Sequence, residues 1–317
     1  MTRDELRAEF QRLCSSPRIE DSYDLLNIYA DYFLKTIKNH FNDPVKDIAE
    51  HQAHIVNQMM LTKILHIKQI ITGVSFKSSD GTSLNEIIDP TVLATLIRNV
   101  YETVCMFNLI YRHSKTDDEK LILYNLWVIA GLKYRQKFES IISTPENSQV
   151  LIEEQQLIKE NVSVIEQTKL YTGLDEKNKE KIQNKIKEKD YKIRFENNNV
   201  VFLNWQELSD TTGIKYKLFD AVYTYFSLYA HPSNVAVQQF GEMFFEETQH
   251  FLGFTSYNLK NLCCLLSAFV ADFIYLFPKV KVTFESQSLI NQLVMNGLNK
   301  MSRGVEYSIN DSYKVLG

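Results

Sequence analysis

The residues best suited to chemistry lie in one polar row near the middle of the C-terminal half. At 100° per residue, one side of a helix carries Asp220, Tyr223, Thr224, Ser227 and His231. The row combines a carboxylate, three hydroxyls and an imidazole, which are groups that position phosphate or transfer protons. We expect it to face a second polar row on an earlier helix.

That second row is formed by Arg98 and Glu102, which are four residues apart and therefore share a helix face. The opposite face is apolar and comprises Val92, Leu93, Leu96, Ile97, Val100, Val104 and Phe107. A lone buried charge is costly, so Arg98 must reach solvent in a cleft or meet a carboxylate, with Glu102 and Asp220 available. The alternative is a structural ion pair that ties two helices together.

His231 closes its predicted helix, because Pro232 follows it. The helix dipole at this end favours a protonated imidazole, and such a histidine can act in proton transfer. The alternative is a helix cap bonded to the last carbonyls. Tyr223 and Ser227 add hydroxyls that could hold a phosphate or water, or could serve only as interhelical hydrogen-bonding groups.

Composition favours a globular helical protein. The chain has 317 residues, of which 44% are hydrophobic and 23% charged. A net charge of −4 argues against a binder of duplex DNA. The charged N-terminus has no signal-peptide core, and the apolar run Leu262–Phe277 is interrupted by Ser267 and Asp272. We therefore expect a cytoplasmic protein without a membrane partner, in which this run is a buried core helix.

The sequence predicts no cofactor and no metal. Glycine-rich phosphate loops are absent, and the four cysteines lack the spacing of a zinc site or disulfide framework. Glu247 and His250 have the Glu-x-x-His spacing of di-iron bundles, but only one such motif is present. His51 and His54, with Asp47, could share a helix face, yet their neighbours indicate a solvated surface.

Apolar spacing of three and four residues favours an all-α, multi-helix bundle. Helices are predicted at 2–14, 20–42, 44–72, 90–113, 117–143, 145–172, 176–189, 215–231, 256–277 and 284–302, with starts at Asp43-Pro44, Asp89-Pro90 and Thr144-Pro145. A small β-hairpin insertion is expected at 192–204, whereas 74–85 has loop composition. The expected division is an N-terminal layer at 1–84, a core at 85–302 with a charged helix and hairpin at 173–204, and a tail at 303–317.

These motifs together resemble the uncharacterised HEPN-like helical families of prokaryotes. The likeness covers residues 85–300 and consists of Arg98-x-x-x-Glu102, an aromatic-rich helix containing Trp127, and Tyr223-x-x-x-Ser227-x-x-x-His231 followed by Pro-Ser. It implies a helical protein of a defence or toxin type, which is either a metal-independent ribonuclease or a non-catalytic partner. The family hallmark places an arginine four to six residues before the histidine, and this chain has Tyr225 in that region.

The resemblance implies that Arg98 must supply the missing cation through space. His231 would then act as a general acid or base on the ribose 2′-hydroxyl or leaving oxygen, Arg98 would stabilise charge on phosphorus, and Glu102 would orient Arg98 or accept a proton. Ser227, Tyr223 and Asp220 would complete the site. The expected partners are RNA and a second copy of the chain or another helical protein. The competing interpretation is a non-enzymatic interaction module whose polar rows fix helix register.

Overall fold

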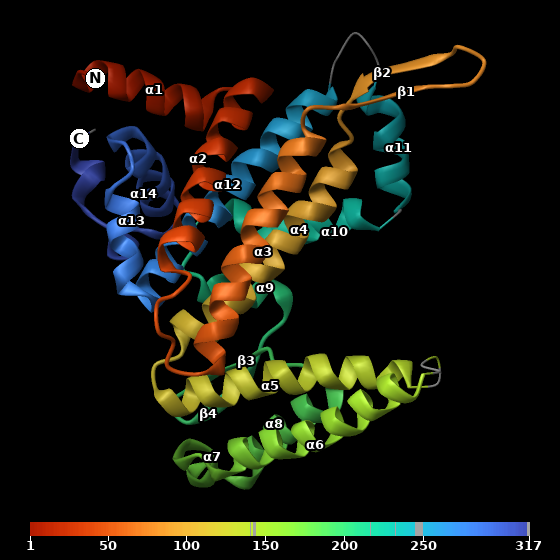
Figure 1. Cartoon of the computed structure of the whole chain (residues 1–317), viewed down its shortest axis with the longest axis vertical. Helices are drawn as coiled ribbons and strands as arrows, with labels where there is room; N and C mark the ends of the chain where they lie inside the picture. Colours follow the sequence, from red (N-terminus) through yellow and green to blue (C-terminus); the bar gives the residue numbers. More distant parts are fainter. Residues whose placement is uncertain (140, 142–143, 216, 232, 245–249, 316–317) are drawn as a thin grey trace. The chain divides into compact units, whose positions relative to one another are not determined.

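The computed structural model describes residues 1–139, 141, 144–215, 217–231, 233–244 and 250–315. Its described part contains 14 α-helices and two small antiparallel sheets, which confirms the all-α prediction (Figure 1). The chain forms two compact units. One comprises Met1–Phe107 and Thr212–Gly317, and the other comprises Asn108–Thr211. These limits differ from the expected boundaries at residues 84 and 302.

The first unit contains most of the helices. In chain order they are α1 (Arg3–Ser15), α2 (Ile19–His40), α3 (Ile48–Ile70), α4 (Pro90–Phe107), α10 (Lys217–Ala230), α11 (Asn234–Met243), α12 (His250–Leu276), α13 (Lys281–Glu285) and α14 (Leu289–Arg303). Strands β1 (Val74–Lys77) and β2 (Ser83–Ile87) form a hairpin between α3 and α4. Short 3₁₀ turns lie at Pro278–Val280, Val305–Tyr307 and Asp311–Val315.

Helix α12 forms the centre of this unit, where it packs against α2, α4 and α14. Phe269 of α12 contacts Phe107 of α4 and Phe33 of α2, with ring centroids 4.7 and 5.8 Å apart. The helix is long and apolar enough to cross a membrane, but 72% of its most apolar 18-residue stretch is buried within the protein. That burial is typical of a core helix, as the sequence predicted for Leu262–Phe277.

The C-terminal segment is held on α14 by buried amides. Asn296 donates to the carbonyl oxygen of Asn310 at 2.7 Å and accepts from the amide of Ile309 at 2.9 Å. Arg303 is fully buried and donates to Asp272 of α12 at 2.7 Å. The expected tail at 303–317 is therefore anchored to the helical body over its described residues.

The second unit begins with a π-helix at Asn108–His113, directly after α4 in the sequence. Its other elements are α5 (Asp117–Arg135), a 3₁₀ turn (Gln136–Phe138), α6 (Pro145–Gln167), α7 (Lys169–Gly173), α8 (Glu176–Glu188), β3 (Ile193–Glu196), β4 (Asn199–Phe202) and α9 (Trp205–Thr211). Asn197 and Asn198 have φ values of 49° and 64°, which suit a tight two-residue turn. This confirms the predicted β3–β4 hairpin.

Several predicted elements differ from the structure. The segment 74–85, expected to be a loop, contributes to the β1–β2 hairpin, and α12 begins at His250 rather than 256. Helix α3 does not begin at Pro44, because Asp47 caps it by accepting the amide of Glu50 at 2.8 Å. Thr144 does cap α6 at Pro145, as predicted.

Candidate functional site

Helix α4 places Arg98 and Glu102 on its outer side. The helix begins at Pro90, where Asp89 Oδ1 accepts the amide of Thr91 at 2.8 Å. Its apolar face is sealed in the core, since Leu93, Ile97 and Val100 are fully buried. The side chains of Arg98 and Glu102 retain 20% and 29% exposure, so the charged pair reaches solvent.

The guanidinium of Arg98 is the centre of the cluster. Its Nε donates to Glu102 Oε1 at 3.0 Å, and its Nη2 donates to the hydroxyl of Tyr223 at 2.8 Å. Its Nη1 lies 3.3 Å from Nε2 of His231. The guanidinium carbon also lies 4.9 Å from the centroid of the Tyr223 ring, within cation–π range. We name these four residues the Arg98 cluster.

Helix α10 carries other predicted site residues, of which Tyr223 contacts α4 and Ser227 bonds within its own helix. Tyr223 packs on Tyr101 of α4 with ring centroids 5.6 Å apart, which fixes its hydroxyl beside Arg98. The hydroxyl of Ser227 donates to the carbonyl of Tyr223 at 2.7 Å, within its own helix. The side chain of Asp220 lies outside the described part of the chain. Ser227 and Asp220 therefore remain predictions as site residues.

His231 directly follows α10 and is exposed. Its backbone amide donates to the carbonyl of Ser227 at 3.2 Å, which completes the last helical turn. The imidazole contact is to Arg98 on another helix. The geometry therefore places an exposed imidazole beside a cation at the end of α10.

Lys63 of α3 is a neighbour that sequence reasoning missed. Its ammonium donates to Thr103 Oγ1 at 3.0 Å and to Asn99 Oδ1, both on α4. Burial lowers the pKa of Lys63, and the nearby carboxylate of Glu102 raises it by a smaller amount. A second cation thus lies next to the Arg98 cluster. The sequence around it, with Thr62, His66 and Lys68 nearby, gave no signal that would single it out.

The residues considered as metal ligands have other roles or contacts in the structure. Asp47 is the cap of α3, and His51 is exposed. His54, expected to be solvated, instead packs 4.2 Å from the Phe277 ring and 5.5 Å from the Phe273 ring. Glu247 lies outside the described residues. Among the described residues, no group of three or more His, Cys, Asp or Glu side chains is arranged to hold a metal ion.

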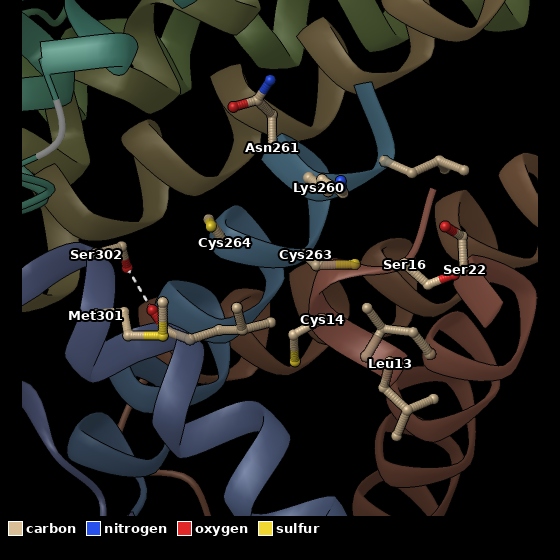
Figure 2. A pocket seen from close by; sticks show the side chains of 13 residues that line it. Leu13, Cys14, Ser16, Ser22, Lys260, Asn261, Cys263, Cys264, Met301 and Ser302 are labelled. Atoms are coloured by element: carbon tan, nitrogen blue, oxygen red, sulfur yellow. Dashed lines mark hydrogen bonds between the residues drawn. The ribbon is translucent and has the colours of Figure 1, made fainter. Parts of the chain in front are cut away.

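An apolar pocket of about 240 Å³ lies elsewhere in the first unit, between α1, α2, α12 and α14 (Figure 2). Its lining includes Cys14, Cys263 and Cys264 together with Leu13 and Met301. Burial raises the pKa of Cys14 to about 12 and that of Cys264 to about 11. The thiols are free and stay protonated at neutral pH, so they are poor nucleophiles and poor metal ligands.

Comparisons place the chain in a family. Neither curated proteins nor solved structures give a significant match. A family model matches residues 87–249, slightly more than half of the chain, and this range includes Arg98, Glu102, Tyr223 and His231. The chain therefore belongs to this family, which is described as a family of unknown function, DUF5677.

Proposed function

We propose that this protein is a HEPN-like ribonuclease of a prokaryotic defence or toxin type, and that it cleaves RNA without a metal ion. One observation carries the proposal. A guanidinium and an imidazole from distant parts of the chain lie 3.3 Å apart, with a phenolic hydroxyl and a carboxylate on the same guanidinium. The partial exposure of Arg98 and the exposure of His231 leave these groups within reach of a large substrate.

The expected reaction is an internal transesterification. His231 accepts the proton of a ribose 2′-hydroxyl, and the 2′-oxygen attacks the adjacent phosphorus. The bond from phosphorus to the 5′-oxygen breaks, and this oxygen takes a proton from solvent. The products are a 2′,3′-cyclic phosphate and a 5′-hydroxyl end. Arg98 stabilises the negative charge that develops on the phosphoryl oxygens, while Glu102 holds the guanidinium in place.

A second candidate is a non-enzymatic interaction module, and a specific observation favours it. Nε, Nη1 and Nη2 of Arg98 each have a partner within the protein. A guanidinium whose three nitrogens are all paired within the protein can fix α10 against α4, since paired buried or half-buried charges often have a structural role. On this interpretation the Arg98 cluster contributes to stability and helix register, and RNA is not a substrate.

The deciding experiment is an RNA cleavage assay in the presence of EDTA. Labelled single-stranded RNA is incubated with the wild type, Arg98→Ala, His231→Ala and the control His51→Ala, which removes an exposed histidine outside the cluster. We expect cleavage by the wild type and control, and a loss of about 100-fold or more in the two cluster variants. An RNA with 2′-deoxyribose at the cleaved position should resist.

The alternative predicts a different pattern. Intact RNA with the wild type, together with lower thermal stability of Arg98→Ala, would support the interaction module. Cleavage that survives in a folded His231→Ala variant would rule out the proposed chemistry. Circular dichroism of each variant separates loss of chemistry from loss of fold.

A further inference from the structure

The second unit contains an open hollow of about 560 Å³, and half of its lining residues are lysines. Lys133 comes from α5, Lys137 from the 3₁₀ turn after it, Lys159 from α6 and Lys189 from the end of α8. One carboxylate, Glu139, lies in the same lining. We name this feature the lysine hollow. Its lining carries an excess of three positive charges in a chain whose net charge is −4.

The lysines lie close enough to affect one another. The ammonium groups of Lys137 and Lys189 lie 4.8 and 5.9 Å from the ring centroid of Tyr134, which is 53% exposed. Burial lowers the pKa of Lys189, and the charges of Lys137 and Lys133 lower it further. Like charges so arranged repel one another, and a bound anion would remove that cost.

Helix capping explains only part of this arrangement. Lys133 donates to the carbonyl of Ile186 at 2.9 Å, and Lys189 is the C-cap of α8, so both oppose the negative end of that helix. Lys137 and Lys159 belong to other elements and take no part in that cap. Lys189 also has a left-handed backbone with φ 61°, a conformation that asparagine or glycine adopts more readily. Capping does not require lysine there.

We propose that the lysine hollow, which belongs wholly to the second unit, binds the phosphate backbone of single-stranded RNA. Naming RNA as the ligand rests on the proposed function. Lysine ammonium groups bind phosphates as point charges, and an exposed tyrosine between two of them offers a face on which a base can stack. The lysine hollow would bind the RNA strand through its phosphates, independently of its base sequence.

The test measures binding without cleavage. Fluorescence anisotropy of a labelled single-stranded RNA is recorded with His231→Ala protein at several salt concentrations. The same protein is then tested with Lys137→Gln and Lys189→Asn together, the asparagine being compatible with the left-handed backbone. The matched control carries Lys177→Gln and Lys187→Gln, two exposed lysines of α8 outside the hollow.

We expect the hollow variant to bind RNA about 10-fold more weakly than the control. The slope of log K against log salt should fall by about 1.4, because each lost single-strand phosphate contact contributes roughly 0.7. Its melting temperature should not fall, since repulsion has been removed. Equal affinities for the hollow and control variants would overturn the proposal. So would stronger competition from inorganic polyphosphate than from unlabelled RNA at equal phosphate concentration.

These outcomes are distinct from those of the cleavage assay. RNA binding by the lysine hollow would persist in a protein that cannot cleave, because the binding test already lacks His231. The converse result is cleavage of RNA by the wild type together with equal RNA binding by the hollow and control variants. That result would support the proposed function and refute RNA binding by the lysine hollow.

Discussion

Nη1 of Arg98 lies 3.3 Å from Nε2 of His231, 133 residues further along the chain. A guanidinium has donors and no acceptor, so in a hydrogen bond across this contact Nε2 of the imidazole is the acceptor. A histidine that accepts a proton uses the lone pair of a ring nitrogen in the same way. A phosphate that draws Arg98 toward itself would release the same nitrogen for a ribose hydroxyl. The contact is therefore compatible with a resting state of the proposed ribonuclease.

Tyr223→Phe tests whether the phenolic hydroxyl holds Arg98 in place. The variant loses the 2.8 Å bond to Nη2 but retains the ring that packs against Tyr101. We expect a loss of about 1 kcal/mol in the free energy of unfolding, measured with urea, because one hydrogen bond to a charged but partly exposed group is removed. A stability equal to wild type would show that the hydroxyl bonds water equally well.

Glu102→Gln separates catalysis from structure. The ion pair with Arg98 is partly exposed on both sides, so we expect its loss to cost only about 0.5 kcal/mol of stability. If Glu102 orients the guanidinium for catalysis, RNA cleavage should fall by about 10-fold or more, since small errors in position reduce rates strongly. A large loss of stability with unchanged cleavage would instead identify a structural pair.

Much of the fold followed from local patterns. Thr144 and Asp89 lie before prolines and accept amides of the next turn, and Asn197-Asn198 forms the turn of the β3–β4 hairpin. These features depend on neighbouring residues alone, so the sequence reveals them. Asp43-Pro44 has the same appearance, but Asp47 competes as a cap and α3 begins four residues later. The alternation of Val74 and Phe76 was the overlooked signal for β1.

The candidate site was predictable only in part. Spacing shows that Arg98 and Glu102 share one face and that Tyr223 and His231 share another, and amphipathicity shows which side of α4 is buried. Spacing does not show which helices are adjacent. Lys63 comes from a third helix that packs on α4, and the half-buried His54 of α3 lies against the rings of Phe273 and Phe277, which are distant in the sequence. Such relationships arise from tertiary packing.

Stability should depend on pH through His54. Burial against the phenylalanines lowers its pKa in the folded protein below the value near 6.5 of an unfolded histidine. The unfolded state therefore binds more protons, so His54 favours folding above about pH 6.5 and this contribution is lost as the pH falls through the folded pKa. Urea unfolding at pH 7.5 and 5.5 should show a smaller difference for His54→Gln than for wild type. An unchanged difference would refute this assignment.

The buried pair of Arg303 and Asp272 should be far more sensitive to substitution than an exposed ion pair. Their side chains are 0% and 2% exposed, and Arg303 also donates to the carbonyl of Ala268 and packs on the Tyr307 ring. Asp272→Asn leaves the guanidinium charge buried without its counterion, so we expect a loss of about 4 kcal/mol in the free energy of unfolding. The exposed pair of Lys314 and Asp311 provides the control, and Asp311→Asn should leave the free energy of unfolding close to that of the wild type. Equal effects in urea denaturation would mean that water reaches the buried pair.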